Sequence, residues 1–342
     1  MKKTYRAMQV TSPGVLEPVE LETPDPGHGD VLIRVEACGI CGADAGAIEG
    51  REPGLHVPRV PGHEVVGRIV ARGPGTPELW ELGQRVGIGR LGGHCQACVQ
   101  CRRGQFQLCE NQPVVGSSQD GGYAEMMLAK STGLVSIPDE LTSVEAAPLL
   151  CAGLATFNAL KKSGAQAGDL VAIQGIGGLG HMAIQYARKM GFKVIAVGRG
   201  AEIADTVLRL GAHGYVDTEQ EDAAARLRIM GGAQVILTTL TDSRAVSALA
   251  SGLAPQGKLL VLGAGKEPLT LSPGQLVGDE CMVQGSLTGS PYESEKTLDF
   301  SLLADIRPMI ETMPLSKANE AYQRMRSGQA MFRMVLTMDA PS

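Results

Sequence analysis

The sequence predicts an α/β protein with two parts, a doubly wound parallel sheet and a β-rich domain. Three observations lead to this fold class. Strand and helix patterns alternate from residue 169 to 286, which is typical of βαβ units and a parallel sheet. A glycine-rich turn stands at the first strand-to-helix junction of that region. The first 150 residues, in contrast, hold short strand patterns separated by glycine and proline, which favour an irregular, mostly β domain.

The predicted elements follow from apolar periodicity. In the alternating region we expect strands at 170–173, 193–197, 215–217, 234–239, 258–262 and 282–286, with helices at 202–210, 223–230 and 243–253. In the β-rich part we expect strands at 31–38, 65–71, 85–88 and 123–128. After residue 287 the patterns predict helices at 297–304 and 316–327 and a last strand at 332–338.

Composition narrows the classes of function. The 342 residues are 44% hydrophobic and 20% charged, which is ordinary for a globular protein long enough for two domains. A net charge of -5 provides no basic field for nucleic acid or an anionic membrane. The N-terminal residues lack the apolar run of a signal peptide, and the longest apolar stretch, 146–160, is too short to span a bilayer. We therefore expect a cytoplasmic protein whose partners are small molecules and copies of itself.

The glycine-rich turn has the spacing of a dinucleotide-binding motif. Gly175, Gly177 and Gly180 form G-x-G-x-x-G, with Gly178 and Leu179 inside it, directly after a buried-strand pattern. Glycines there allow a sharp turn and a close approach to a pyrophosphate, and the N-terminus of the next helix favours an anion. In a chain with 45 glycines such a triplet alone could be an ordinary turn. The alternating context favours the nucleotide interpretation.

Eight cysteines in a protein expected to be cytoplasmic indicate metal binding rather than disulfides. Four of them, Cys95, Cys98, Cys101 and Cys109, form C-x2-C-x2-C-x7-C in a glycine-rich loop. Four thiolates close a tetrahedron around zinc and leave no position for substrate, so this pattern predicts a structural zinc. An iron–sulfur cluster is the main competing interpretation.

Three shorter motifs are weak when taken singly. Cys41 lies in G-I-C-G-A-D, His63 and Glu64 follow Pro-Gly, and Cys151 begins Cys-Ala-Gly just before the nucleotide region. Each cysteine could be a small buried hydrophobe and the histidine a hydrogen-bonded core residue. Together with the four-cysteine loop, the glycine-rich turn and the closing strand F-R-M-V-L, they make the whole chain resemble the zinc-dependent alcohol dehydrogenases of the medium-chain dehydrogenase/reductase family.

This resemblance implies a fold, a set of cofactors and an activity. It implies a GroES-like catalytic domain over residues 1–152 and 288–342, a Rossmann domain over 153–287, and two zinc ions per subunit in a homotetramer or homodimer. The activity implied is hydride transfer between NAD(P)(H) and a primary alcohol or aldehyde through a zinc-bound oxygen. A cysteine at position 151, where the related polyol dehydrogenases usually carry glutamate, points to the branch acting on simple alcohols and aldehydes.

The resemblance also implies the roles of the site residues. Cys41, His63 and Cys151 would hold the catalytic zinc and leave a fourth position open. Asp44 would orient His63 through its second ring nitrogen, and Glu64 would stand near the metal as a transient ligand. The other interpretations are a turn cap for Asp44 and a solvated charge for Glu64.

Two positions depart from the family pattern. Ala43 and Gly46 stand where the family usually has a hydroxyl residue and often a histidine, which pass a proton from the substrate. Water could replace this relay, or the reaction could be reduction of an activated C=C bond or a C=N bond; a non-catalytic nucleotide-binding relative is a further alternative. Arg90 falls where the family often has an aromatic pocket residue. It is either a solvated surface residue or a contact for an acidic or polar substrate.

Cofactor preference depends on the end of the second strand of the alternating region. An NAD-specific enzyme usually has an acidic residue about 20 positions after the glycines. This chain has Gly198 and Arg199, which leave room and a planar charge for a 2′-phosphate, so NADP is favoured over NAD. If Arg199 points to solvent, both cofactors could be used. By resemblance Arg333 would contact the pyrophosphate; otherwise it is a surface-strand charge.

Overall fold

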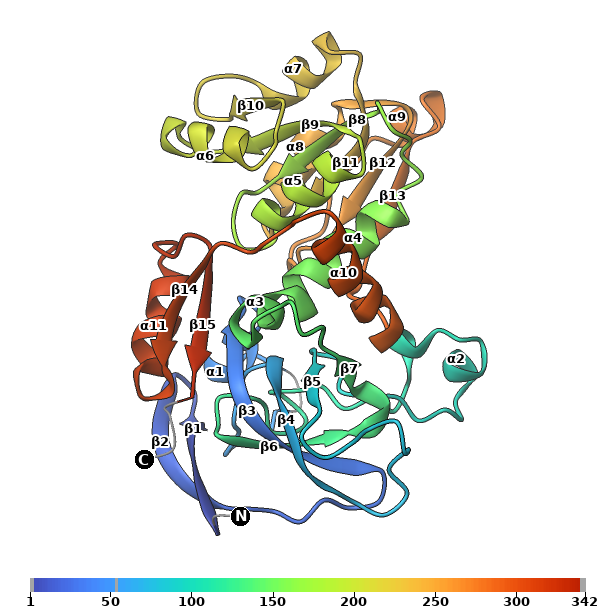
Figure 1. The fold of residues 1–342 in the computed structure, drawn as a ribbon. Coiled ribbons are helices and arrows are strands. Elements are labelled where there is room, and N and C mark those ends of the chain that lie inside the picture. Colours follow the sequence, from blue (N-terminus) through green and yellow to red (C-terminus); the bar gives the residue numbers. More distant parts are fainter. Residues whose placement is uncertain (1–2, 53–54, 339–342) are drawn as a thin grey trace. The chain divides into compact units, whose positions relative to one another are not determined.

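The computed structural model describes residues 3–52 and 55–338. The chain divides into two compact units, Met1–Cys151 with Gly289–Ser342, and Ala152–Thr288. We refer to them as the metal unit and the nucleotide unit, and Figure 1 labels their helices and strands. Each unit has its own sheet and its own core.

The metal unit is built on a seven-stranded sheet. Its order is β14-β15-β3-β4-β5-β7, and β6 pairs with β3; only the pairing of β14 with β15 is parallel. A separate antiparallel pair, β1 and β2, completes the unit. The strands are β1 (Thr4–Ser12), β2 (Val15–Glu22), β3 (Asp30–Ile40), β4 (Glu64–Arg72), β5 (Arg85–Ile88), β6 (Met126–Lys130), β7 (Val135–Ser136), β14 (Ile310–Pro314) and β15 (Arg333–Thr337).

The central strand β3 sets the position of the metal-binding motifs. Most of its side chains are buried, which explains its nearly continuous apolar run. It pairs antiparallel with β4, and Gly39 stands opposite Glu64 in that register. Cys41 directly follows β3 and His63 directly precedes β4. The two motifs, 22 positions apart in the sequence, therefore meet at one end of a strand pair.

The metal unit also contains short helices and turns. α3 begins with a capping box between Thr142 and Glu145, and α10 begins with one between Ser290 and Glu293, each of which satisfies two helix-end donors. The helices are α1 (Asp44–Ile48), α2 (Val99–Arg102), α3 (Ser143–Pro148), α10 (Pro291–Leu303) and α11 (Ala318–Arg326), with 3-10 turns η1 (Phe106–Leu108), η2 (Ser131–Gly133) and η5 (Leu315–Lys317).

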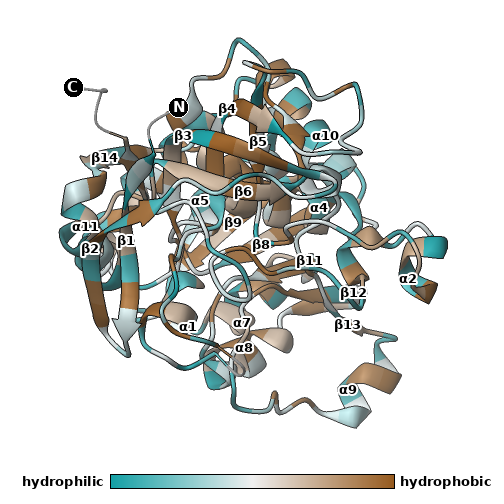
Figure 2. Ribbon diagram, turned by 90° about the horizontal axis from the view of Figure 1, so that it is seen from below, coloured by the Kyte–Doolittle hydropathy of each residue, from teal (hydrophilic) through white to brown (hydrophobic). Residues whose placement is uncertain are grey.

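The nucleotide unit is a six-stranded, fully parallel sheet. Its order is β10-β9-β8-β11-β12-β13, so the strand order reverses beside β8, as in a doubly wound dinucleotide-binding fold. β8 and β11 are brown along most of their length in Figure 2. The elements are α4 (Leu154–Lys161), β8 (Leu170–Gln174), α5 (Gly180–Lys189), β9 (Lys193–Gly198), η4 (Ala201–Ile203), α6 (Ala204–Arg209), β10 (Gly214–Asp217), α7 (Ala223–Ile229), β11 (Ala233–Thr238), α8 (Ser243–Ala250), β12 (Leu253–Val261), α9 (Pro273–Gly278) and β13 (Met282–Gly285).

One helical run among the described residues is long and apolar enough to cross a membrane. It spans Ser143–Lys161 and is longer than the apolar stretch 146–160, which by itself is too short to span a bilayer. Within the structure 83% of its most apolar 18-residue segment is buried, which is the behaviour of a core helix. Between α3 and α4 this run contains a π-helical turn, η3 (Leu149–Gly153).

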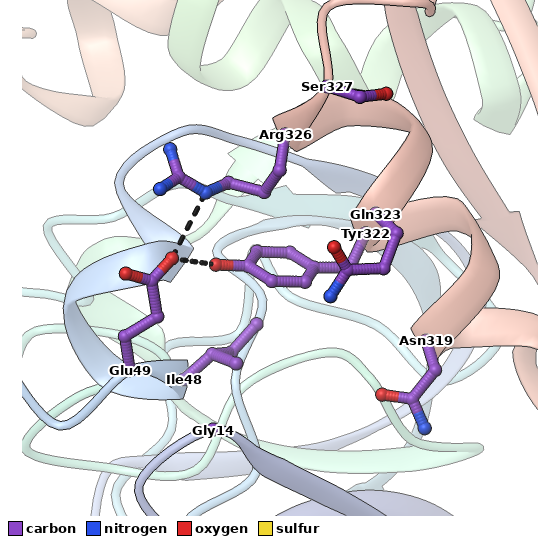
Figure 3. Close-up of a pocket in the computed structure, with 8 residues that line it drawn as sticks. All are labelled: Gly14, Ile48, Glu49, Asn319, Tyr322, Gln323, Arg326 and Ser327. Carbon is purple, nitrogen blue, oxygen red and sulfur yellow. Dashed lines mark hydrogen bonds and ion pairs between the residues drawn. The ribbon is translucent and has the colours of Figure 1, made fainter.

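A polar cluster ties α11 to the end of α1. The Tyr322 hydroxyl donates to Oε1 of Glu49 at 2.6 Å, and Nε of Arg326 lies 3.0 Å from the same oxygen (Figure 3). Arg51 pairs with the other carboxylate oxygen. The hydrogen bond from Tyr322, followed by the charges of Arg326 and Arg51, lowers the pKa of Glu49. Because α1 also contains Asp44, this cluster helps to fix the helix that carries Asp44.

We expect Tyr322→Phe to destabilise the protein by about 1 kcal/mol at pH 7, because it removes a hydrogen bond to a charged, partly exposed group. The difference from wild type should shrink as the pH falls below about 4, because a carboxylate with a lowered pKa loses its contribution on protonation. Urea denaturation at several pH values measures this. Tyr292→Phe is the matched control, since Tyr292 is 64% exposed; equal effects of the two substitutions would contradict the prediction.

Candidate metal centres and nucleotide turn

Four side chains from distant parts of the sequence meet in the interior of the metal unit. The ligand atoms of Cys41, His63, Glu64 and Cys151 all lie within 4.8 Å of one another, and all four residues are buried. The two sulfurs are 3.9 Å apart, and Sγ of Cys151 is 3.5 Å from Nε2 of His63. We call this group the buried centre.

The buried centre fits a tetrahedral zinc ion. With zinc–sulfur bonds of about 2.3 Å, two thiolates of a tetrahedral site stand roughly 3.8 Å apart. The observed separation of 3.9 Å between the sulfurs of Cys41 and Cys151 agrees with this. Two thiols and one imidazole are also a donor set that leaves a fourth position open. The residues present could therefore hold a reactive zinc.

Cys151 is directed into the centre by a π turn. It lies in η3, where the wider helical turn follows Pro148 of α3. Such π-bulges insert extra backbone into a helix and are frequent at functional sites. The sequence motif located this cysteine, but the widened turn that positions it was not predicted. Pro148 inside an otherwise helical pattern is the only local signal for it.

Asp44 lies against the far side of the His63 ring. Its Oδ1 is 2.7 Å from Nδ1 of His63, and its Oδ2 accepts hydrogen bonds from the Cys41 amide and the Tyr123 hydroxyl, each at 2.9 Å. The carboxylate is 2% exposed. This contact leaves Nε2 of His63 facing the thiols; at metal sites a carboxylate commonly holds a ligand histidine through its other ring nitrogen in this way.

Protonation states in the centre respond strongly to this arrangement. Burial alone would lower the pKa of His63, but the charges of Asp44 and Cys41 outweigh it and raise that pKa to about 10. The hydrogen bond from Cys151 lowers the pKa of Cys41 well below its usual range, with a further contribution from the charge of His63. The pKa of Cys151 is raised by the same hydrogen bond and by burial.

Glu64 is paired with an arginine from the other end of the chain. Arg333 of β15 is 3% exposed and its guanidinium pairs with Oε1 of Glu64. Oε2 of Glu64 has no hydrogen-bond partner among the described residues, and a Cβ on Gly39 would overlap it. Burial raises the pKa of Glu64 to about 7 even though the charge of Arg333 opposes that shift. Arg333 is therefore not a surface charge; its contact with a pyrophosphate stays a prediction.

The four-cysteine loop forms a second candidate metal centre. The sulfurs of Cys95, Cys98, Cys101 and Cys109 lie within 4.8 Å of one another. Backbone amides of Cys98 and Cys101 donate to the sulfurs of Cys95 and Cys98, at 3.4 and 3.5 Å. A hydrogen bond from Asn111, followed by backbone amides, lowers the pKa of Cys95 to about 6. So compact a group fits one ion, whereas an iron–sulfur cluster needs thiolates spread around several metal atoms.

In the nucleotide unit the glycines form the turn between β8 and α5. Gly175 has a left-handed φ of 90°, and a Cβ on Gly180 would overlap the carbonyl oxygen of Gly175. Around Gly177, in contrast, no described atom outside its neighbours lies within 4 Å of an added Cβ. Gly178 follows, and Leu179 precedes the first residue of α5. The turn thus combines tight packing with an open backbone that a phosphate could approach.

Gly198 and Arg199 lie at the end of β9. These are the residues from which the sequence predicts a preference for NADP. A Cβ on Gly198 would stand 3.0 Å from the Tyr215 hydroxyl, so the glycine keeps this edge clear. The Arg199 side chain is 81% exposed, and its Nε lies 3.7 Å from a carboxylate oxygen of Glu219. An exposed pair of this kind is weak, so the guanidinium remains available to an anionic ligand.

The two departures from the family pattern lie at the start of α1. Ala43 precedes the helix and Gly46 is inside it. A Cβ on Gly46 would stand 3.3 Å from Oε2 of Glu52, and Oε1 of Glu52 accepts from Arg90 at 2.8 Å. Arg90 is only 28% exposed and its charge is already balanced. It is therefore a paired, half-buried residue rather than a solvated one.

Comparison with known proteins agrees with this fold. Residues 27–139 match the family model of the alcohol dehydrogenase GroES-like domain, and residues 178–303 match that of the zinc-binding dehydrogenases. The alcohol dehydrogenase notN of Aspergillus sp. is 40% identical over 92% of each chain, and the aldehyde reductase AdhA of Synechocystis sp. is 34% identical over 98% of this chain and 99% of its own. The acetophenone reductase of Geotrichum candidum, solved with NAD, superimposes with a TM-score of 0.88 at 28% identity over 98% of each chain.

The chain belongs to the zinc-binding medium-chain alcohol dehydrogenases, a family of oxidoreductases. Both parts of the predicted fold class, the GroES-like domain and the Rossmann-like parallel sheet, are confirmed.

We expect zinc binding at the buried centre to weaken steeply as the pH falls. Zinc must displace a proton from His63, whose pKa is raised to about 10, and another from Cys151. Affinity should therefore drop roughly 100-fold per pH unit near neutrality. Competition with a chelator of known pH dependence measures the slope.

His63→Gln is the matched control for this slope. A neutral amide has no proton to displace, so the variant should lose only about tenfold per pH unit. The four-cysteine loop is the same in both proteins, so zinc bound there contributes equally to both measurements and does not affect the difference between the two slopes. Identical slopes for wild type and variant would contradict the assignment of a proton to His63.

Proposed function

We propose that this protein is an NADP(H)-dependent zinc alcohol dehydrogenase that interconverts a primary alcohol and its aldehyde. The observation that carries the proposal is the buried centre, in which Cys41, His63 and Cys151 present two sulfurs and one ring nitrogen at metal-ligand spacing. A protein that only binds a nucleotide needs no open zinc site. The family membership supports the same reaction class.

In this proposal each residue has a stated task. Cys41, His63 and Cys151 hold the catalytic zinc, which supplies the Lewis acidity that stabilises negative charge on the substrate oxygen. Asp44 keeps the His63 ring in place, and Glu64 stands by as a carboxylate that could approach the metal if it left Arg333. Cys95, Cys98, Cys101 and Cys109 hold a second, structural zinc that stabilises their loop.

The nucleotide turn and Arg199 are assigned to the cofactor. Gly175, Gly177, Gly178, Leu179 and Gly180 would receive the pyrophosphate at the N-terminus of α5, and Gly198 and Arg199 would receive the 2′-phosphate of NADP. With NADP(H) bound, the cofactor would supply the hydride that converts an aldehyde to its alcohol, and the proton on the alcohol oxygen would come from solvent. A relative solved with NAD keeps NAD use open as the competing outcome.

We also propose a reducing, cytoplasmic setting and a homo-oligomer. All eight cysteines are free, which suits a compartment that keeps thiols reduced. A tetramer or a dimer is what the family resemblance suggests.

A second candidate reaction follows from Ala43 and Gly46. Neither residue can carry a proton, so a substrate that makes little demand on protonation at oxygen is favoured by these two positions. Reduction of an activated C=C or C=N bond is such a reaction. Carbonyl reduction stays first because the three ligands of the buried centre are complete.

The cofactor assignment predicts that Arg199→Ala lowers kcat/KM for NADPH about tenfold or more and leaves that for NADH nearly unchanged. The reason is the loss of a charge-assisted contact with the 2′-phosphate. Arg226→Ala, which removes another exposed arginine of the nucleotide unit, is the matched control. An unchanged NADPH/NADH ratio in the Arg199 variant would show that this side chain does not read the cofactor.

The reaction assignment predicts alcohol products when the purified protein is given NADPH with saturated aldehydes and enals. Cys41→Ala should lower this activity by about a thousandfold or more, because several kcal/mol of Lewis-acid stabilisation is lost. Cys281→Ala, at a half-buried thiol of the nucleotide unit, should leave it unchanged. Saturated aldehydes from the enals would support C=C reduction, and NADPH binding without turnover would support a non-catalytic relative.

A further inference from the structure

We propose that Tyr123 is a positioning residue of the buried centre, which acts on the metal ligand His63 through Asp44. The inference rests on the proposed function only in taking His63 as a ligand. Its own basis is a chain of buried contacts in the metal unit. The sequence predicts Tyr123 only as the first residue of a strand and gives it no role in the site.

The contacts run without a break from the phenol to the ligand. The Tyr123 hydroxyl donates to Oδ2 of Asp44 at 2.9 Å, and Oδ1 of the same carboxylate is 2.7 Å from Nδ1 of His63. Tyr123 and His63 are fully buried and Asp44 is 2% exposed. With so little access to water, the orientation of this carboxylate depends on the protein donors around it.

Oδ2 of Asp44, the oxygen that does not face His63, accepts from two donors, the Tyr123 hydroxyl and the Cys41 amide. Holding Oδ2 from two directions fixes the plane of the carboxylate and therefore the position of Oδ1 beside His63. Loss of the phenol hydroxyl would leave the amide as the single donor to Oδ2. The carboxylate could then rotate, and the ring of His63 would lose its fixed orientation toward the thiols.

The ring of Tyr123 is itself locked in place. Gly62, which has a left-handed φ of 94°, lies directly against it, and a Cβ on Gly62 would overlap the ring. The Tyr123 amide donates to the carbonyl of Pro61 at 3.0 Å, and the Gly122 amide donates to that of Gly62 at 2.9 Å. The segment that carries Tyr123 is therefore paired with the segment that carries His63. A donor held this firmly can act as a fixed reference for Asp44.

The phenol stays a donor over the working pH range. Burial raises the pKa of Tyr123 well above its usual range, and the charge of Asp44 raises it further. Because the hydroxyl remains protonated, it can only donate to the carboxylate. Phenylalanine at this position keeps the ring packing against Gly62 and removes that donor alone.

The test compares zinc release by wild type, Tyr123→Phe and the control Tyr186→Phe. Tyr186 is another fully buried tyrosine, in α5 of the nucleotide unit. We expect Tyr123→Phe to lose the zinc of the buried centre to a chelator about tenfold faster, at the low end of what outer-shell substitutions cost, while the zinc of the four-cysteine loop leaves at the wild-type rate. Wild-type release at both sites would overturn the inference.

Cobalt substitution gives a readout that a general loss of stability does not move. The visible absorption bands of cobalt at the buried centre should shift in Tyr123→Phe and stay unchanged in Tyr186→Phe. In an Asp44→Asn background, Tyr123→Phe should add no further shift, because the two residues act in one chain. An additive effect would show that Tyr123 does not act through Asp44.

If the phenylalanine variant does not fold, 3-fluorotyrosine placed at position 123 keeps the phenol hydroxyl and adds one fluorine to the ring beside it, which makes the hydroxyl a stronger hydrogen-bond donor. In the cadmium-loaded protein the cadmium resonance of the buried centre should then move and that of the four-cysteine loop should not; two unchanged resonances would overturn the inference. Failure of the proposed function is a different result. Wild-type protein that binds no metal at the buried centre would remove the function itself, whereas equal behaviour of wild type and variant removes only the role of Tyr123.

Discussion

The close approach of two thiols and an imidazole in the buried interior is the constraint on which the metal unit depends. Such groups are costly to bury unless they are paired or bound to a metal. The unit meets this constraint because β3 ends and β4 begins at the same edge of the sheet, next to Cys41 and His63. Gly39 faces Glu64 across β3 and β4, which brings Cys41 and His63 together, and a π turn directs Cys151 to them. The sheet register and the metal centre are thus one structural feature.

Two glycines show how little free space this arrangement leaves. A Cβ on Gly39 would overlap the carboxylate of Glu64, and one on Gly62 would overlap the ring of Tyr123. Each glycine is therefore required by a side chain that belongs to the surroundings of the centre, not by a turn alone. Close packing of this kind transmits small displacements to the ligands. The residues around the ligands are constrained nearly as tightly as the ligands themselves.

The parts of the molecule that could be predicted from the sequence are those that depend on patterns between residues close together in the chain. The Gly175–Gly180 spacing and the alternation after it are local, and they led to the parallel sheet that the structure contains. The pairing of Arg333 with Glu64 could not be predicted because it joins positions 269 residues apart. The π turn at Cys151 could not be predicted from periodicity either, because it interrupts the helical spacing of the apolar residues. The expected strand at 123–128 instead begins at Met126, because Tyr123 pairs with Pro61 beside His63.

The departures at Ala43 and Gly46 have a structural counterpart. Oε2 of Glu52 stands 3.3 Å from where a Cβ on Gly46 would be, and Arg90 binds the other oxygen of that carboxylate. A side chain at position 46 would therefore crowd the carboxylate that pairs with Arg90. Glycine at this position, which cannot carry a proton, leaves the ion pair of Glu52 and Arg90 undisturbed. The same small residue accounts both for the absence of a relay group at position 46 and for the room that the half-buried pair occupies.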